Sequence, residues 1–314
     1  MELLGIKVVS YWAGKIPENS ELHFRSFAHN RGSNDTYKLY LDEHFSSSSS
    51  IPDGLLWLRN EPWFELEKID LEKLMQEKGL RKFSYWKQNS LYIVIRRFKI
   101  SILSFLAARF DQMSSLEDKF VFFKQRHIPS VGFSLNHADS FSGLVNHFTY
   151  RADLFRTLIL SQGAKENNIL YADLDICFLK PLNEFLSLHP YTSRWGTEDF
   201  ANTCLLFVPH HSNSMKGLVQ ELQKTSSAWP WTLYSKENCL KYGIEIKPLK
   251  MFDPIWDRDF AAPGSDSSFF SDPEVADRWI AWLDEHSLAY HWHNNWTTPR
   301  DPESTYEILL RRFK

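Results

Sequence analysis

The sequence predicts an α/β fold in which the strands of a central sheet alternate with helices, and three observations lead to this prediction. Residues 6–12 form a short β-rich run, residues 18–30 have a helical pattern, and residues 36–41 form a second β-rich run. Strand, helix and strand in this order are typical of a βαβ unit on a parallel sheet. The alternation returns later, with a helix at 153–162 and a strand at 169–171.

The boundaries of these elements follow from their residues. Gly14 and Pro17 close the first strand. In the helix at 153–162, Leu154 and Leu158 belong to one apolar face. Further along, residues 203–208 predict another core strand, which Pro209 ends, and residues 279–283 predict a helix. The whole chain, 1–314, is expected to form one catalytic domain.

The middle of the chain differs in character. Residues 46–50 are a serine run, which predicts a loop. Residues 69–120 have a mostly helical pattern, and we expect 51–139 to form a helical insert or subdomain. The apolar stretch 91–110 carries four basic residues, so it does not predict a membrane span. It is best explained as a surface helix; a basic helix lying on an anionic membrane is the alternative.

Composition excludes some functions. The 36 basic and 39 acidic residues give a net charge of −3, which offers no electrostatic case for binding nucleic acid. Three widely spaced cysteines predict neither a disulfide framework nor a zinc site and favour a reducing compartment. Residues 1–10 lack the pattern of a signal peptide. We therefore expect a cytoplasmic protein, with contact to the inner face of the membrane as an open alternative.

Asp173 and Asp175 are the strongest candidates for chemistry because they directly follow the buried run 169–171. Side chains two residues apart on an extended chain face the same way, so the two carboxylates are expected to lie together. They would repel each other unless a cation lies between them, and oxygen ligands suit Mg²⁺ or Mn²⁺. Such an ion would hold a diphosphate at the carboxyl end of the sheet. From these residues alone, two solvated aspartates in a turn are the alternative.

Two further groups of residues are candidates for a binding site together with Asp173 and Asp175. Asp153 and Arg156 share a helical face, where they indicate a surface ion pair or, in a binding site, a grip on sugar hydroxyls. Residues 291–296 concentrate histidine, asparagine and tryptophan, which can ligate a metal, bind phosphate or close over a ligand. A purely structural role of this second cluster is equally open.

Taken together, these residues resemble the glycosyltransferases with a DXD sugar-binding region. That group includes yeast-type mannosyltransferases, lactosylceramide α-galactosyltransferases, bacterial capsule and lipopolysaccharide transferases and, more distantly, clostridial glucosylating toxins. The resemblance covers most of the chain outside 51–139. Its motifs stand here as Asp153-Leu-Phe-Arg156, Gly163, Tyr171-Ala-Asp173-Leu-Asp175, Tyr11-Trp12-Ala13-Gly14, and the segment from His291 to Trp296.

The resemblance implies a GT-A-type, Rossmann-like mixed sheet flanked by helices, and a role for each matching residue. Trp12 would stack on the nucleobase with Tyr11 beside it, and Asp153 and Arg156 would hold hydroxyls of the donor sugar. Asp173, Asp175 and His291 would hold Mn²⁺ or Mg²⁺, with Asp175 bound directly. Further contacts with the nucleotide-sugar donor are implied for Tyr171 and Asn202, and for Asn294 and Trp296 on a mobile tail. Asn202 would also face the acceptor.

The function that this resemblance implies is a metal-dependent, retaining transfer of a hexose from a nucleotide sugar. A UDP-sugar is the favoured donor and a GDP-sugar the alternative. The acceptor would be a glycan or glycolipid of surface polysaccharide or lipopolysaccharide synthesis, although a protein acceptor stays open. Two other functions compete: a haloacid-dehalogenase-like phosphatase, and a non-catalytic carbohydrate-binding or scaffold protein.

Overall fold

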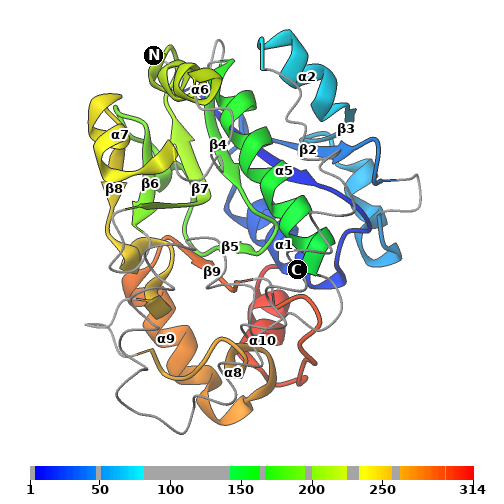
Figure 1. The fold of residues 1–314 in the computed structure, drawn as a ribbon. Coiled ribbons are helices and arrows are strands. Elements are labelled where there is room, and N and C mark those ends of the chain that lie inside the picture. Colours follow the sequence, from blue (N-terminus) through cyan, green and yellow to red (C-terminus); the bar gives the residue numbers. More distant parts are fainter. Residues whose placement is uncertain are drawn as a thin grey trace, which may run out of the picture. The chain divides into compact units, whose positions relative to one another are not determined.

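A computed structural model describes most of the chain. The described residues are 4–46, 51–80, 142–162, 167–194, 200–224, 233–256, 262–293 and 295–314. The chain divides into two compact units, Met1–Arg81 with Tyr150–Lys314, and Lys82–Thr149. The sheet, the site and the helices described below belong to the first unit, apart from the beginning of one helix, α5 (Figure 1).

A seven-stranded mixed sheet with the order β3-β2-β1-β4-β7-β6-β8 forms the centre of the first unit. Its strands are β1 (Ile6–Trp12), β2 (Thr36–Asp42), β3 (Phe64–Ile69), β4 (Asn168–Ala172), β6 (Tyr191–Arg194), β7 (Ala201–Val208) and β8 (Glu245–Lys247). Strands β3, β2, β1 and β4 are parallel, whereas β7 runs antiparallel to both β4 and β6. The predicted α/β class with a mixed sheet flanked by helices is confirmed.

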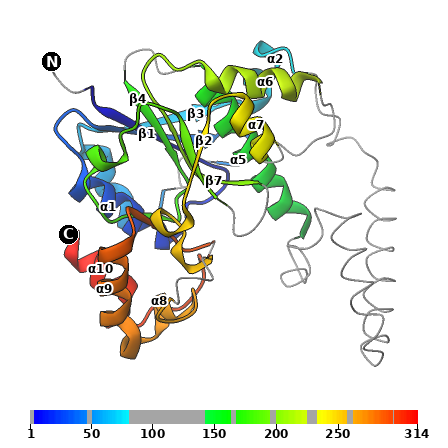
Figure 2. The ribbon, with the colours of Figure 1, turned by 90° about the vertical axis from the view of Figure 1, so that its left-hand side faces the viewer.

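Helices cover the two faces of this sheet, and its central strands β1, β2, β4 and β7 are buried on both sides (Figure 2). On β2, Tyr37 and Leu39 face α1 (Glu21–Asn30), whereas Tyr40 faces α5 (Ser142–Ser161), with its ring 5.1 Å from that of Phe155. The unit β1, α1, β2 is the predicted βαβ unit, with β1 and β2 in parallel register.

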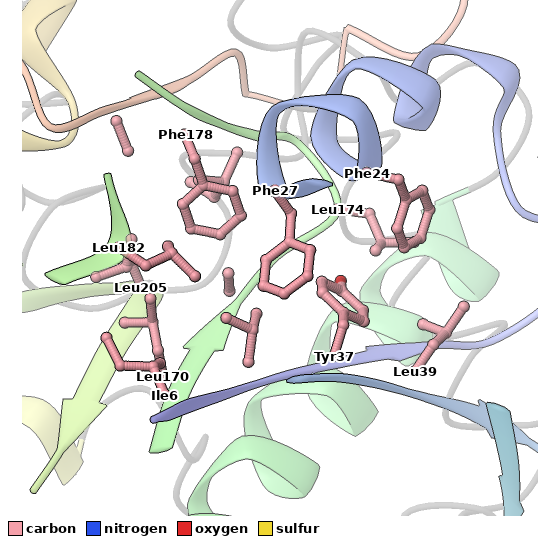
Figure 3. Close-up of a cluster of buried hydrophobic side chains, with 14 of the residues drawn as sticks. Ile6, Phe24, Phe27, Tyr37, Leu39, Leu170, Leu174, Phe178, Leu182 and Leu205 are labelled. Carbon is pink, nitrogen blue, oxygen red and sulfur yellow. The ribbon is translucent and has the colours of Figure 1, made fainter. Parts of the chain in front are cut away.

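The core between α1 and the sheet is rich in aromatic rings. Phe27 of α1 lies with its ring 5.0 Å from that of Tyr37 on β2, and Phe178 lies beside it (Figure 3). Packed aromatic pairs of this kind add to the free energy gained from burial. Because Phe178 lies three residues after Asp175, this core anchors one side of the candidate site.

A second, two-stranded sheet joins β5 (Ile176–Phe178) to β9 (Ala289–His291) in antiparallel pairing. Next to it lie α8 (Ser268–Ser271), α9 (Ala276–His286) and α10 (Thr305–Arg312) (Figure 1). Their buried residues form a separate cluster that includes Trp279, Tyr290 and Trp292. The small sheet therefore connects the carboxyl end of β4 to the C-terminal part of the chain.

The other described helices are α2 (Leu71–Glu77), α6 (Ser214–Lys224) and α7 (Lys236–Lys241). Short 3₁₀ segments lie at Glu18–Ser20, Asp53–Asn60, Leu182–Phe185, Leu249–Met251, Pro254–Trp256 and Pro273–Val275. Among the described residues, no helix is both long enough and apolar enough to cross a membrane.

The region expected to be a helical insert, 51–139, is described only as far as Leu80. Within that part, Phe64–Ile69 is a strand at the edge of the main sheet, paired in parallel with β2. It was missed because Phe64-Glu-Leu-Glu-Lys-Ile69 is short and stands beside a helical pattern. Residues 81–139, with the apolar stretch 91–110, lie outside the described residues, as does most of the serine run.

Candidate active site

Asp173 and Asp175 lie in a turn between β4 and β5 and not along one strand. The backbone N–H of Ile176 donates to the carbonyl of Asp173 at 3.2 Å, which closes the turn. The expectation that both carboxylates share one face of an extended strand is therefore wrong, because the chain leaves the main sheet after Ala172. The pair does lie at the carboxyl end of β4, beside the carboxyl end of the parallel strand β1, where open α/β sheets bind ligands.

His291 lies against Asp175 because the small sheet brings them together. Ile176 on β5 pairs with His291 on β9, and the N–H of Trp292 donates to the carbonyl of Asp175 at 3.1 Å. The Nε2 atom of His291 is 3.2 Å from Oδ2 of Asp175, and both side chains are more than nine-tenths buried. Two residues 116 positions apart in sequence thus present adjacent oxygen and nitrogen atoms, and their binding of a shared metal ion stays a prediction.

A third carboxylate, that of Asp253, lies on the other side of His291. Its Oδ2 is 3.6 Å from Nδ1 of His291 and accepts a hydrogen bond from the side-chain amide of Asn202 at 2.9 Å. Its Oδ1 is 2.6 Å from Nε2 of His293. Asp253 and the two histidines could hold a metal ion as a group. Asn202 therefore belongs to the cluster through Asp253.

Arg156 links the other predicted residues. Its guanidinium lies 3.3 Å from Oδ2 of Asp173 and 3.3 Å from Oδ1 of Asp153, and it donates to Oγ1 of Thr203 at 2.9 Å. The side chain is 5% exposed. Tyr171 donates to the remaining oxygen of Asp173 at 2.7 Å. Arg156 and Tyr171 thus orient Asp173, and the prediction that Arg156 and Asp153 grip a sugar stays a prediction.

The pKa shifts show how these buried charges affect one another. Burial raises the pKa of Asp153 to about 6, against the opposing effect of Arg156. Burial also raises the pKa of Asp173, with Arg156 again opposing it and Asp175 adding to the increase. The cluster therefore disfavours further negative charge and favours a positive charge near its carboxylates.

The surroundings of His291 also favour a positive charge. Burial works against a charge on its ring, but Cys204 and Asp175 outweigh burial and hold the pKa of the imidazole well above its usual value. For Asp253, burial is outweighed by His293, so the pKa of that carboxyl lies below its usual range. The surroundings of His291 therefore stabilise a positive charge at this point of the structure.

The side-chain oxygen and nitrogen atoms of the site have a spacing that fits a divalent metal ion. Two atoms that bind one octahedral ion at about 2.1 Å and at right angles lie roughly 3 Å apart, and Asp175 Oδ2 and His291 Nε2 are 3.2 Å apart. Carboxylate oxygen and imidazole nitrogen form a ligand set that suits Mn²⁺. Asp173, 26% exposed, has the greatest access of the three predicted ligands. These residues therefore suit the metal that was expected.

Trp12 and Trp296, both predicted to contact the nucleotide, lie together. Their ring centroids are 5.2 Å apart in an edge arrangement, and both rings are partly exposed. Tyr11, by contrast, is buried: its ring stacks on Phe155 at 4.7 Å, and its hydroxyl donates to the Asp42 carboxylate. The expected place of Tyr11 beside the nucleobase is therefore not open to a ligand in this structure.

Two predicted residues fall outside the described ranges, and one cavity lies near the site. Asn294, a predicted donor contact, and Gly163 lie outside the described residues. A cavity of about 510 Å³ includes none of the predicted site residues. It is lined by Lys15, Glu18, Glu21, Ile51, Pro52, Asp53, Gly54, Leu55, Leu56, Arg59 and Arg300. The indole N–H of Trp12 donates to the carbonyl of Lys15 at 2.9 Å, so the cavity adjoins the loop after β1.

Sequence reasoning missed three polar residues of the cluster: Thr203, Asp253 and His293. Thr203 and Asp253 follow no recognisable pattern, and only the fold brings them to the site. His293 stands within the predicted 291–296 cluster, and its backbone φ of 49° is unusual for a residue other than glycine. A histidine two residues after a predicted ligand was the available signal.

Comparisons with known proteins give matches of structure only. No protein-family model and no curated protein matches the sequence. Similar solved structures include three glycosyltransferases, all with identities below 25% and TM-scores below 0.5. The apo form of the bifunctional glycosyltransferase WbbM is 9% identical with a TM-score of 0.43, and the match covers 100% of this chain and 50% of WbbM.

The galactosyltransferase LgtC, in complex with donor and acceptor sugar analogues, is 11% identical with a TM-score of 0.39, over 98% of this chain and 95% of LgtC. The apo form of GlyE from Streptococcus pneumoniae TIGR4 is 12% identical with a TM-score of 0.41, over 98% of this chain and 63% of GlyE. This chain thus spans half of WbbM and less than two thirds of GlyE.

Proposed function

We propose that this chain is a metal-dependent glycosyltransferase that moves a hexose from a nucleotide-sugar donor to a glycan acceptor, with retention of the anomeric configuration. The proposal depends on one observation: the buried side chains of Asp175 and His291 contact each other at the carboxyl end of β4, close to Asp173. Mn²⁺ or Mg²⁺ held there would neutralise the negative charge that develops on the departing diphosphate.

The residues of the chain would prepare the site for this reaction. Arg156 and Tyr171 hold the Asp173 carboxylate through both of its oxygens, so it needs little reorganisation when a donor binds. Trp12 presents a partly exposed aromatic ring at the carboxyl end of β1, which suits stacking on a nucleobase. Trp296 touches that ring, so the segment after His291 would cover the nucleotide and exclude water.

Two features of the described site support the proposal of retention. Among the residues that the structure describes, no carboxylate outside the cluster stands out as a nucleophile, and the cluster carboxylates are engaged with Arg156, His291 and His293. We therefore expect the acceptor hydroxyl to attack the sugar on the same face that the diphosphate leaves. A UDP-sugar donor and an acceptor from surface polysaccharide or lipopolysaccharide synthesis remain our choice, with a GDP-sugar as the alternative donor.

The phosphatase alternative needs a first aspartate that attacks phosphorus. Here both oxygens of Asp173 face donors, Tyr171 at 2.7 Å and Arg156 at 3.3 Å, which reduces the nucleophilicity of the carboxylate. A scaffold protein without activity would gain nothing from burying the carboxylates of Asp175 and Asp253 on either side of one histidine, since buried charges are costly. The transferase is the function that these contacts favour.

The test is a panel of UDP- and GDP-sugars, each with and without Mn²⁺, followed by thermal unfolding and by slow donor hydrolysis. A donor that binds the folded state at 100 times its Kd stabilises it by about 2.7 kcal/mol. We expect one nucleotide sugar to stabilise the protein and to be hydrolysed only with metal. Asp175→Ala should abolish both effects.

Asp277→Ala is the matched control, because it makes the same substitution at an exposed aspartate on α9. It should respond to donor and metal as the unmodified protein does. If no nucleotide sugar stabilises the protein, the transferase proposal is wrong. Release of phosphate from a phosphomonoester would favour the phosphatase instead. A product whose anomeric configuration is inverted relative to the donor would overturn retention alone.

A further inference from the structure

The Nδ1 atom of His291 is a buried polar atom without a hydrogen-bond partner. The opposite ring nitrogen, Nε2, faces Asp175 at 3.2 Å. The nearest carboxylate oxygen to Nδ1 belongs to Asp253, at 3.6 Å. This distance is slightly too long for a hydrogen bond, and a shift of a few tenths of an ångström in either side chain would close it.

We propose that Asp253 is a positioning residue of the metal site. Its carboxylate accepts a hydrogen bond from the Nδ1–H group of His291 and thereby directs Nε2 toward an ion shared with Asp175. The inference rests on the proposed function, because it takes Asp175 and His291 as metal ligands. Asp253 itself makes no contact with the ion or the substrate in this proposal.

The chemistry of imidazole requires such a partner. A neutral histidine carries one proton, so a ring that binds metal through Nε2 must carry its proton on Nδ1. In the buried surroundings of His291, that N–H has to be satisfied. Ligating histidines commonly donate their second nitrogen to a carboxylate, which fixes both the tautomer and the orientation of the ring. Asp253 is placed to do this.

Asp253 is itself held on several sides, as a positioning group must be. The Asn202 amide donates to Oδ2 at 2.9 Å, and His293 contacts Oδ1 at 2.6 Å. The backbone N–H of Asp253 donates to the carbonyl of Leu249 at 2.7 Å. The side chain is only 2% exposed. These contacts leave the lone pairs of Oδ2 that are not used by Asn202 available to His291.

A different arrangement is open to the same residues. Asp253, His291 and His293 have ligand atoms within 4.8 Å of one another, and they could bind the ion directly. In that case Nδ1 of His291, and not Nε2, would face the metal, and a second histidine would join it. The two arrangements differ in the number of nitrogen ligands, which is measurable.

The experiment measures Mn²⁺ binding by the full chain without any donor. Isothermal titration gives the Kd, and pulsed electron paramagnetic resonance of bound Mn²⁺ detects the ¹⁴N nuclei of ligating imidazoles. For the unmodified protein we expect one coupled nitrogen. In Asp253→Asn, we expect the Kd to rise by about 10- to 100-fold and the nitrogen coupling to weaken or disappear, because His291 loses its orientation.

Two further variants separate positioning from folding and from charge. Asp253→Glu keeps a carboxylate, so it should restore the nitrogen coupling and most of the affinity. Asp266→Asn removes a negative charge from the same neighbourhood. Asp266 interacts electrostatically with both His291 and Asp253, but it accepts a hydrogen bond from the hydroxyl of Tyr290, at 3.0 Å. We expect its Mn²⁺ affinity to stay within a few-fold of that of the unmodified protein.

The outcomes distinguish this inference from the function on which it rests. If the unmodified protein binds no Mn²⁺ or shows no nitrogen coupling, the proposed metal site itself is wrong. One coupled nitrogen that persists unchanged in Asp253→Asn, with an unchanged Kd, overturns the positioning role alone. Two coupled nitrogens, one of them lost in His293→Gln, overturn it as well, because Asp253 and His293 would then be ligands. An equal loss of affinity in Asp266→Asn would reduce the effect to simple charge.

Discussion

His23 is a fully buried histidine whose titration should make the stability of this protein depend on pH. Its Nδ1 atom lies 2.6 Å from the carbonyl of Ile176, and its Nε2 atom lies 2.6 Å from the hydroxyl of Tyr37. A carbonyl can only accept, so Nδ1 donates and Nε2 accepts from the tyrosine. Burial lowers the pKa of His23 to about 4, although its bond to Ile176 and the charge of Asp175 act in the opposite direction.

The magnitude follows from the difference between the folded and unfolded chain. The pKa of His23 falls from 6.5 in the unfolded chain to about 4 in the folded protein, and each pKa unit corresponds to about 1.4 kcal/mol. Neutral His23 therefore contributes about 3 kcal/mol that is fully present above pH 6.5. Below that pH the unfolded chain binds the proton and the folded protein does not. The free energy of unfolding should fall by about 2 to 3 kcal/mol between pH 7 and pH 4.5.

The assay compares urea unfolding of the unmodified protein and of His23→Gln at several pH values in that window. Glutamine can still donate to Ile176 but does not titrate. The buried Asp153, whose pKa is raised to about 6, gives a pH dependence of opposite sign, but it is present in both proteins and cancels in the comparison. The stability difference should shrink as the pH falls. A difference that stays constant, with equal m-values, would refute the reasoning.

Three other predictions concern separate parts of the chain. Gly217→Ala in α6 would ordinarily stabilise a helix, but the new Cβ would lie 2.2 Å from the ring of Tyr242, so we expect a loss of about 1 to 3 kcal/mol in urea unfolding; a gain would contradict the packing. Asp42→Asn should cost about 3 to 5 kcal/mol by the same assay, because it removes the charge that pairs with buried Arg151 at 2.5 Å; a loss below 1 kcal/mol would show that the pair matters little. Trp12→Ala should weaken UDP binding by about tenfold in calorimetry, the size expected from loss of base stacking; an unchanged Kd would remove Trp12 from the nucleotide site.

The parts of the fold that could be predicted from sequence are those set by local patterns. The strand Ile6–Trp12 has the predicted bounds, and Thr36–Asp42 extends the expected strand by one residue. Both are buried on both faces, so their β-rich runs are nearly continuous and easily recognised. Strands of three residues, such as Ile176–Phe178 and Ala289–His291, carry no such pattern. They exist because they pair with each other across more than 100 residues of sequence.

The site divides in the same way. Asp173 and Asp175 could be found because they follow a recognisable strand, and His291 because it stands in an unusual aromatic and polar segment. A turn at the two aspartates was open as an alternative, but sequence alone could not favour it over a strand, since the turn depends on the pairing of β5 with the distant strand β9. Asp253 could not be foreseen either, because a single aspartate before a proline has no distinctive pattern. Asp253 is a candidate only because the fold brings its carboxylate next to Asn202, His291 and His293.

The pairing of β5 with β9 also changes the role of the C-terminal segment. A mobile tail over the donor was expected, but the segment is anchored on both sides of Trp296. Before it, Trp292 is fully buried; after it, Tyr306 is fully buried, and its hydroxyl donates to the carbonyl of Asn19 at 3.0 Å. Any closure over a nucleotide must therefore come from the stretch between these two residues, moving as a loop fixed at both ends. The backbone pairing that places His291 beside Asp175 lies outside this stretch.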